Sequence, residues 1–165
     1  MKAYKLFNLK HGKLFPLYVF ANESLPLGEW LNAKAGERTT SGKVKSKIGQ
    51  LAYRAGFHAC EFPCATHIGG KSSPDLKAPD YRKAEQVWAE VEFDDSIDYQ
   101  TEADASPRGC ITDRVPLNGF YFFQTNAKAV CRWLIGGTMR INRILTDDEV
   151  VKINASVGLA DLPRL

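Results

Sequence analysis

The densest cluster of side chains that could carry out chemistry lies within residues 53–70. It holds two of the three histidines and two of the four cysteines of the chain, together with an arginine and several glycines. The side chains that could act there are Arg54, His58, Cys60, Cys64 and His67. Metal binding, nucleophilic catalysis and anion binding are the three kinds of chemistry that this combination could serve.

The first alternative is a zinc site, because histidine and cysteine are the usual zinc ligands. Structural zinc sites take one close pair of ligands and then a second pair a dozen or more residues away. The spacing from His58 through Cys60 and Cys64 to His67 has no such second pair, and Pro63 stiffens the short connection. We therefore expect four reduced thiols and no bound metal, with zinc as the alternative.

The second alternative is a cysteine nucleophile, with Cys60 or Cys64 activated by a histidine. The base must lie within hydrogen-bond reach of the thiol. On a strand, His58 and Cys60 would lie side by side on one face rather than facing each other. No local protease-type signature accompanies them, so buried cysteines that pack as small apolar side chains are the simpler interpretation.

The third alternative is a site for an anionic ligand. The guanidinium of Arg54 offers a fork of donors suited to phosphate, and Gly56 lets the backbone approach a ligand closely. The imidazoles of His58 and His67 can donate to ribose hydroxyls. These four residues are the predicted binding site, and a structural role as core histidines with a paired arginine is the alternative.

The elements that must position this cluster are mostly strands. Residues 87–93 alternate apolar and polar side chains, as a half-buried strand does, and residues 120–123 form a short apolar run. Residues 5–20 predict a hairpin that turns at His11–Gly12, and residues 133–145 predict a last hairpin that turns at two glycines. We expect residues 87–93, 120–123 and 139–145 to be neighbouring strands in one core. The aromatic side chains expected to be buried there are Trp88 and Trp133.

Few helices are expected. Thr146 with a glutamate three residues later is a capping box, which predicts a C-terminal helix over about residues 147–156. Residues 32–50 are punctuated by glycine and predict a basic, mobile loop. The pattern as a whole predicts one strand-rich α+β domain over residues 1–165. The basic side chains of the loop are Lys34, Arg38, Lys43, Lys45 and Lys47.

Composition narrows the class of protein. The chain has 165 residues, of which 44% are hydrophobic and 25% charged, as in an ordinary globular domain. Its net charge of +3 is too small to indicate a dedicated nucleic-acid binder. It lacks an apolar run of the roughly 20 residues that span a bilayer, and its start lacks a signal-peptide core. We expect a cytoplasmic protein with reduced cysteines and no membrane contact.

Short segments that follow one another in a characteristic order extend over most of the chain. They are Leu14–Tyr18, Pro26–Trp30, Arg54–His58, Ala65–His67, Val87–Glu92, Trp133–Ile135 and Asn142–Leu145. From about residue 4 to residue 150, this series resembles an uncharacterised domain of phage and prophage proteins. The resemblance implies a phage-derived protein that acts in the cytoplasm of the host, and it implies no particular activity.

A second resemblance is to ADP-ribosyltransferase-like domains, including those of phage polyvalent proteins. It implies a split sheet with few helices and NAD as the cofactor, held by an arginine or histidine on an early strand. Arg54 or His58 matches that position, residues 87–93 match the floor of the cleft, and residues 133–145 match a late hairpin. The family pattern has a glutamate before the late strand, whereas this chain has Arg132.

This departure bears on activity, because an arginine would repel the positive charge that develops as nicotinamide leaves. Glu90, Glu92 and Gln124 are the candidates to replace the missing glutamate. The resemblance therefore implies a binding or counter-defence module for a host protein or a nucleotide-type ligand, with weak or no transferase activity. An active ADP-ribosyltransferase or NAD glycohydrolase is the alternative. A nucleic-acid binder that uses the basic loop at 32–50 is a further alternative, although no aromatic residue is interleaved there to stack on bases.

Overall fold

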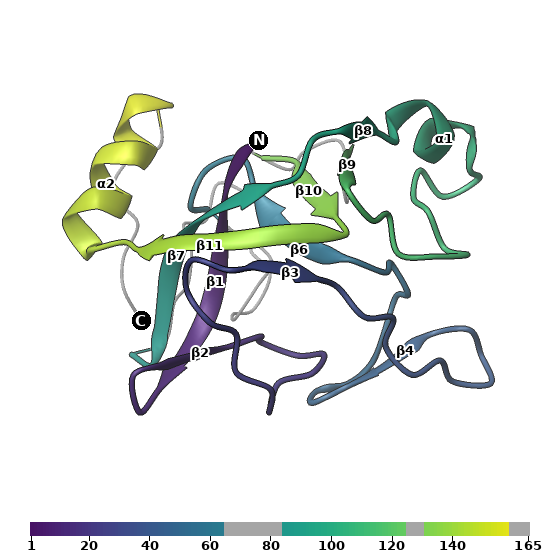
Figure 1. The fold of residues 1–165 in the computed structure, drawn as a ribbon, viewed down its shortest axis with the longest axis horizontal. Coiled ribbons are helices and arrows are strands. Elements are labelled where there is room, and N and C mark those ends of the chain that lie inside the picture. Colours follow the sequence, from purple (N-terminus) through teal and green to yellow (C-terminus); the bar gives the residue numbers. More distant parts are fainter. Residues whose placement is uncertain (65–83, 125–130, 159–165) are drawn as a thin grey trace.

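The computed structural model describes residues 1–64, 84–124 and 131–158. This part of the chain is strand-rich with two short helices, consistent with the expected α+β class (Figure 1). In chain order, the elements are β1 (Lys2–Lys10), β2 (Lys13–Phe15), β3 (Trp30–Asn32), β4 (Val44–Ser46), β5 (Gly49–Leu51), β6 (Phe57–Cys60), β7 (Gln86–Phe93), β8 (Ile97–Asp98), α1 (Gln100–Ala105), β9 (Gly119–Phe123), β10 (Trp133–Gly136), β11 (Thr138–Ile144) and α2 (Asp147–Ser156).

The described strands form a nine-stranded mixed sheet and a separate two-stranded sheet of β4 and β5. The order across the large sheet is β3-β11-β7-β1-β6-β10-β9-β8, and β2 pairs with the end of β1. The β8–β9 pair is parallel, and the other pairs are antiparallel. The pairing of β1 with β7 extends from Lys2 opposite Glu92 to Asn8 opposite Gln86. The first strand of the chain therefore lies in the middle of the sheet.

The hairpin predicted over residues 133–145 is wrong. Gly137 alone separates β10 from β11, yet β6, β1 and β7 lie between these two strands in the sheet. The chain thus passes from one part of the sheet to another, and β11 runs across the direction of β1 (Figure 1). Two-residue hairpin turns need a positive φ, which neither Gly136 nor Gly137 has.

Close packing explains these two glycines. A Cβ atom at Gly136 would lie 2.7 Å from Cε1 of the buried Phe93 ring. A Cβ atom at Gly137 would lie 2.5 Å from the amide nitrogen of Leu117, and closer still to the Pro116 carbonyl. The glycines therefore let the backbone of the crossing pass against its neighbours, rather than letting it turn.

Of the three strands expected to be neighbours in the sheet, only two pair with each other. β7 and β11 pair as expected, but β9 pairs with β10 and β8 and not with either of them. Phe120 on β9 nevertheless packs in the same buried cluster as Val91 on β7, because the curled sheet brings the two strands onto one core. Trp88 is fully buried, as predicted, whereas Trp133 is only half-buried.

Both faces of the central strands are buried. One face carries a cluster that includes Phe7, Val91 and Ile141. The opposite face carries Trp88 and is covered in part by Val150 of α2. Apolar burial on both faces explains why β1 shows weaker alternation than β7, on which Glu90 and Glu92 remain partly exposed.

Two local patterns predicted the observed structure correctly. The β1–β2 hairpin turns at His11 and Gly12, which both have positive φ, as a type I′ turn requires. Thr146 accepts a hydrogen bond from the Glu149 amide, and the Glu149 side chain accepts one from the Thr146 amide, so α2 begins with the predicted capping box. The segment expected to be a loop at 32–50 differs, because it contains β4 and part of β5.

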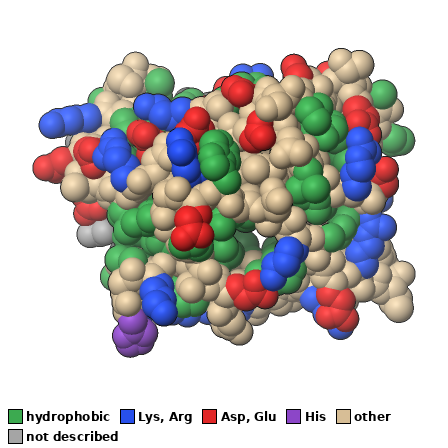
Figure 2. Space-filling view, viewed as in Figure 1, with side chains coloured by type: hydrophobic (Ala, Val, Ile, Leu, Met, Phe, Trp, Pro, Cys, Tyr) green, Lys and Arg blue, Asp and Glu red, His purple; other side chains and the backbone are tan. Residues whose placement is uncertain are grey.

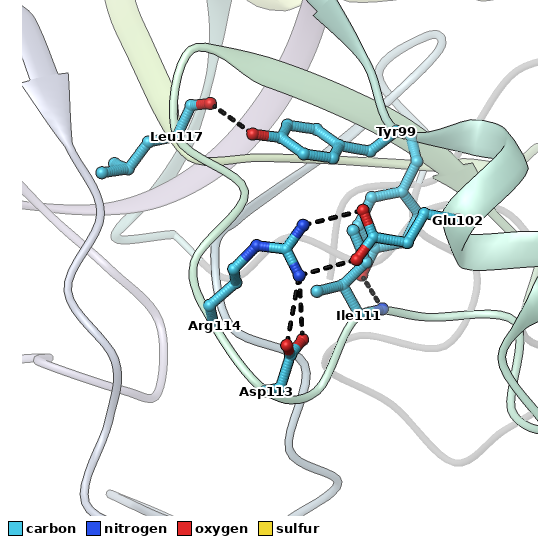
Figure 3. Close-up of polar contacts among 7 residues, drawn as sticks. Tyr99, Glu102, Ile111, Asp113, Arg114 and Leu117 are labelled. Atoms are coloured by element: carbon cyan, nitrogen blue, oxygen red, sulfur yellow. Dashed lines mark hydrogen bonds and ion pairs between the residues drawn. The ribbon is translucent and has the colours of Figure 1, made fainter.

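The excursion between β7 and β9 is held by an ion-pair network (Figure 3). The Arg114 guanidinium donates to both carboxylate oxygens of Glu102 on α1, at 2.6 and 2.7 Å, and also contacts Asp113. The Tyr99 hydroxyl donates to the Leu117 carbonyl at 3.0 Å. These contacts fix the 116–117 backbone against which the Gly137 crossing packs.

Candidate functional site

A cavity of about 470 Å³ lies over β1 and β6. Its walls come from those strands, from residues 16–20, and from the segment that contains β4 and β5. Aromatic and aliphatic side chains make up most of the lining. Its basic members are Lys5, Lys34, Arg54 and His58, and among the described residues no aspartate or glutamate lines it. The cavity is therefore apolar in its walls and basic in its polar groups.

The cavity lies where the pairing between β1 and β6 stops. These strands share a single register pair, Tyr4 opposite Cys60, whereas β6 keeps four pairs with β10. Beyond Tyr4, the Lys5 ammonium donates to the His58 carbonyl at 2.8 Å. The Lys5 side chain thus donates a hydrogen bond to a backbone carbonyl of β6 at the place where the two strands separate.

Lys5 is a member of this site that the sequence reasoning did not identify. It is half-buried, and burial lowers the pKa of its amine from 10.5 to about 8, although a charge on Cys60 would raise it. Lys5 lies on the same strand face as the buried Ala3 and Phe7. The sequence pattern that could have identified Lys5 is a lysine that alternates with apolar residues on the buried face of a strand.

Arg54, Gly56 and His58 all line this cavity. The Arg54 guanidinium lies over the Phe123 ring, 4.4 Å from its centroid. His58 Nε2 and the Arg54 carbonyl are 2.8 Å apart, and because a carbonyl can only accept, Nε2 carries the hydrogen. One nitrogen of the His58 imidazole therefore donates a hydrogen bond within the fold. His67, the fourth predicted residue, lies outside the described residues.

The candidate catalytic residues lie elsewhere. Glu90 and Glu92 follow Trp88 on one face of β7, where Glu92 pairs with Arg140 at 2.6 Å and Glu90 lies 3.5 Å from Arg143. Neither lines the cavity over β1 and β6. Gln124 lines a second, more open cavity of about 740 Å³, which Arg132 also lines. The structure therefore does not bring these three residues to the predicted binding residues.

The Arg132 side chain is held by the carboxylate of Glu61, the residue that directly follows β6. Its guanidinium donates to Glu61 at 2.6 Å, its amide donates to the same carboxylate at 2.9 Å, and it stacks on Phe122 at 3.9 Å. Burial alone would raise the pKa of Glu61, but the hydrogen bonds from Arg132 outweigh it and hold that pKa below its usual value. Arg132, which stands where a glutamate was expected, is thus neutralised by the neighbouring Glu61.

We expect Glu61→Gln to lower the free energy of unfolding by up to about 1 kcal/mol at pH 7, the range of a partly exposed ion pair. Because the folded pKa of Glu61 is lowered, its contribution is present above the unfolded value of about 4.3 and is lost as the pH falls through the folded value. Urea titrations at pH 7 and pH 3 measure this, with the exposed Asp148→Asn as the control. An equal cost at both pH values would contradict the assignment.

The cysteines are free thiols in this structure. The Cys131 thiol donates to the Cys64 carbonyl at 2.9 Å. Its hydrogen bond with Cys60, together with burial, raises the pKa of Cys131, so this thiol is poorly suited to act as a nucleophile. Within residues 1–64, 84–124 and 131–158, no group of three histidine, cysteine or acidic side chains could hold a metal ion. The proposed zinc ligand His67 is not among them.

Much of the basic segment at 32–50 is engaged within the chain. Lys34 pairs with Glu23 at 2.5 Å, and Lys45 pairs with Glu37 at 2.6 Å. Arg38 stacks on Tyr53 with 3.9 Å to the ring centroid. On the face seen in Figure 2, lysine and arginine side chains are mixed with aspartate and glutamate side chains. This face therefore offers no broad basic surface for a nucleic-acid backbone.

Comparison with family models, with curated proteins and with solved structures gives no match. In the described part of the chain, neither helix has the length and apolar character needed to cross a membrane. The residues of the cavity over β1 and β6 therefore carry the functional argument.

Proposed function

We propose that this chain is a phage- or prophage-derived cytoplasmic module that binds a nucleotide-type anion, with weak or no transferase activity. A counter-defence role in the host fits such a module. The observation that carries the proposal is the lining of the cavity over β1 and β6, where basic groups meet apolar walls and the described residues contribute no acidic side chain.

Each part of a nucleotide has a counterpart in this lining. Aromatic side chains such as Tyr18 and Trp133 can contact a planar base through their faces. Arg54 can pair with phosphate oxygens through the two donors of its guanidinium fork. A cavity of about 470 Å³ is within the range of small-molecule sites. A ligand that combines an anionic group with an apolar ring therefore matches this site better than a neutral sugar does.

The surroundings favour binding over transfer. A transferase needs a carboxylate near the ribose as nicotinamide leaves, because positive charge develops there. Glu90 and Glu92 lie on another part of β7, where they pair with Arg143 and Arg140 of β11. Glu61 is paired with Arg132. The single register pair between β1 and β6 gives limited support to the split sheet of ADP-ribosyltransferase-like domains.

We expect the protein to bind ADP-ribose and NAD, and Arg54→Ala to weaken that binding by at least about 1.5 kcal/mol, the scale of a hydrogen bond to a charged group. Isothermal titration calorimetry measures the affinity. The matched control is Arg143→Ala, since Arg143 lies outside the cavity lining. Thermal unfolding of each variant without ligand separates loss of binding from loss of fold.

Incubation with NAD distinguishes a binding module from an enzyme. Release of free nicotinamide, measured by chromatography, would overturn the proposal of weak or no activity in favour of a transferase or glycohydrolase. Failure of both ligands to bind at millimolar concentration, with Arg54→Ala strongly destabilised, would show instead that Arg54 has a structural role.

A further inference from the structure

We propose that Lys5 forms an imine with a carbonyl compound that enters the cavity over β1 and β6, so that this cavity is a covalent site for aldehydes. The inference deepens the proposed function and rests on it in one respect, since both place a ligand in the same cavity. It adds a reacting atom, Lys5 Nζ, and a chemical class, aromatic aldehydes that bear an anionic group.

The position of Lys5 is the first argument. Lys5 is one of the residues that line the cavity, and its amine donates to the carbonyl of another lining residue, His58, at 2.8 Å. In the described residues, no carboxylate is placed within ion-pair distance of this amine. The Lys5 amine therefore has no anionic partner among them to stabilise its charged form, whereas Lys45 pairs with Glu37.

The desolvated surroundings are the second argument. Lysines that act through imines are buried against apolar groups, which disfavour the charged amine. The pKa of Lys5 is lowered to about 8 by burial, with an opposing effect of Cys60. The other titratable side chains that line the same cavity are Tyr4, Tyr18, Lys34, Tyr53, Arg54 and His58.

The reaction balances without an added redox partner. Neutral Nζ attacks the carbonyl carbon, a C–N bond forms, and proton transfer gives a carbinolamine. Loss of the carbonyl oxygen as water then leaves the C=N bond. Added borohydride delivers hydride to this bond and yields a stable secondary amine on Lys5. The basic and aromatic lining favours aldehydes whose ring carries a phosphate.

The test uses pyridoxal 5′-phosphate as the probe, at pH 7.5 and with limiting reagent, followed by borohydride and peptide mapping by mass spectrometry. We expect Lys5 to be modified at least about tenfold faster than Lys45, because burial raises the neutral fraction of the Lys5 amine at this pH. Raising the pH should bring the rate at Lys5 to half of its maximum near pH 8. Modification spread evenly over the lysines would overturn the proposal.

Two further arms separate this inference from the proposed function. Benzaldehyde has no phosphate, so preferential labelling of Lys5 by it supports the covalent site even if anion binding fails. Protection of Lys5 by NAD, which has no free aldehyde, supports both proposals, whereas labelling of Lys5 without such protection supports the inference and contradicts nucleotide binding. Lys5→Arg should lose the label, and Lys34→Arg should keep it. If Lys5→Arg does not fold, the comparison of lysines within the wild-type protein decides.

Discussion

Gly137→Ala is expected to lower the free energy of unfolding by roughly 3 kcal/mol, at the upper end of the usual cost of overpacking. The added methyl group would meet the backbone of Pro116 and Leu117, which cannot rotate away as a side chain can. Tyr99 holds the Leu117 carbonyl from the other side, so this segment has little freedom to retreat. Urea unfolding of wild type and variant measures the cost.

The matched control is Gly42→Ala. Gly42 has a φ of +76° and open space around its Cβ position, so this change adds only backbone strain of about 1 kcal/mol. A smaller cost for Gly137→Ala than for Gly42→Ala would mean that the crossing does not pass as closely to residues 116–117 as the structure shows.

The second large effect concerns the pH dependence of stability. The folded pKa of Lys5 is about 8 because burial disfavours its charge, and an unfolded lysine has a pKa of about 10.4. Between these values the unfolded chain binds more protons, so the free energy of unfolding rises with pH. Wild type should therefore gain about 2 kcal/mol relative to Lys5→Met between pH 7 and pH 10.

Chemical unfolding at pH 7, 8, 9 and 10 gives this difference directly. Subtracting the Lys5→Met curve removes the tyrosines and cysteines that titrate in the same range. The control is Lys45→Met, which removes a lysine whose side chain is exposed. A wild-type curve parallel to that of Lys5→Met would contradict the desolvated amine, and with it the basis for imine formation.

Local signals in the sequence predicted local structure well. The positive φ values at His11 and Gly12 and the capping box at Thr146 depend on residues close in the chain, so the sequence pattern contains all that determines them. The strands at β7 and β9 were also predicted from short patterns. The pairing of β9 was not, because the expected hairpin joined β10 to β11, whereas β10 pairs with β9 and β6.

The two glycines at 136–137 show where sequence reasoning is ambiguous. Gly-Gly between two apolar runs is typical of a tight hairpin, but glycine is also used where backbones approach closely. The choice between these roles depends on Phe93, Pro116 and Leu117, which are distant in sequence. No pattern within 133–145 contains that information.

The candidate site was predicted in part for the same reason. Arg54, Gly56 and His58 are close in the chain, so their shared cavity follows from one segment. Lys5 joins them only because β1 runs beside β6 and then separates from it. The expected replacement carboxylates failed to join the site because Arg140 and Arg143 on β11 bind them.

The central position of β1 has a consequence for synthesis on the ribosome. Its main partner β7 is separated from it by residues 11–85. At about 5–20 residues per second, translation of that interval takes on the order of 10 s. During this time the nascent β1 has β2 along Asn8–Lys10 and a single bridge to β6 as its pairing partners. The apolar strand that later forms the middle of the core is therefore exposed to chaperones and to aggregation while the chain is being made.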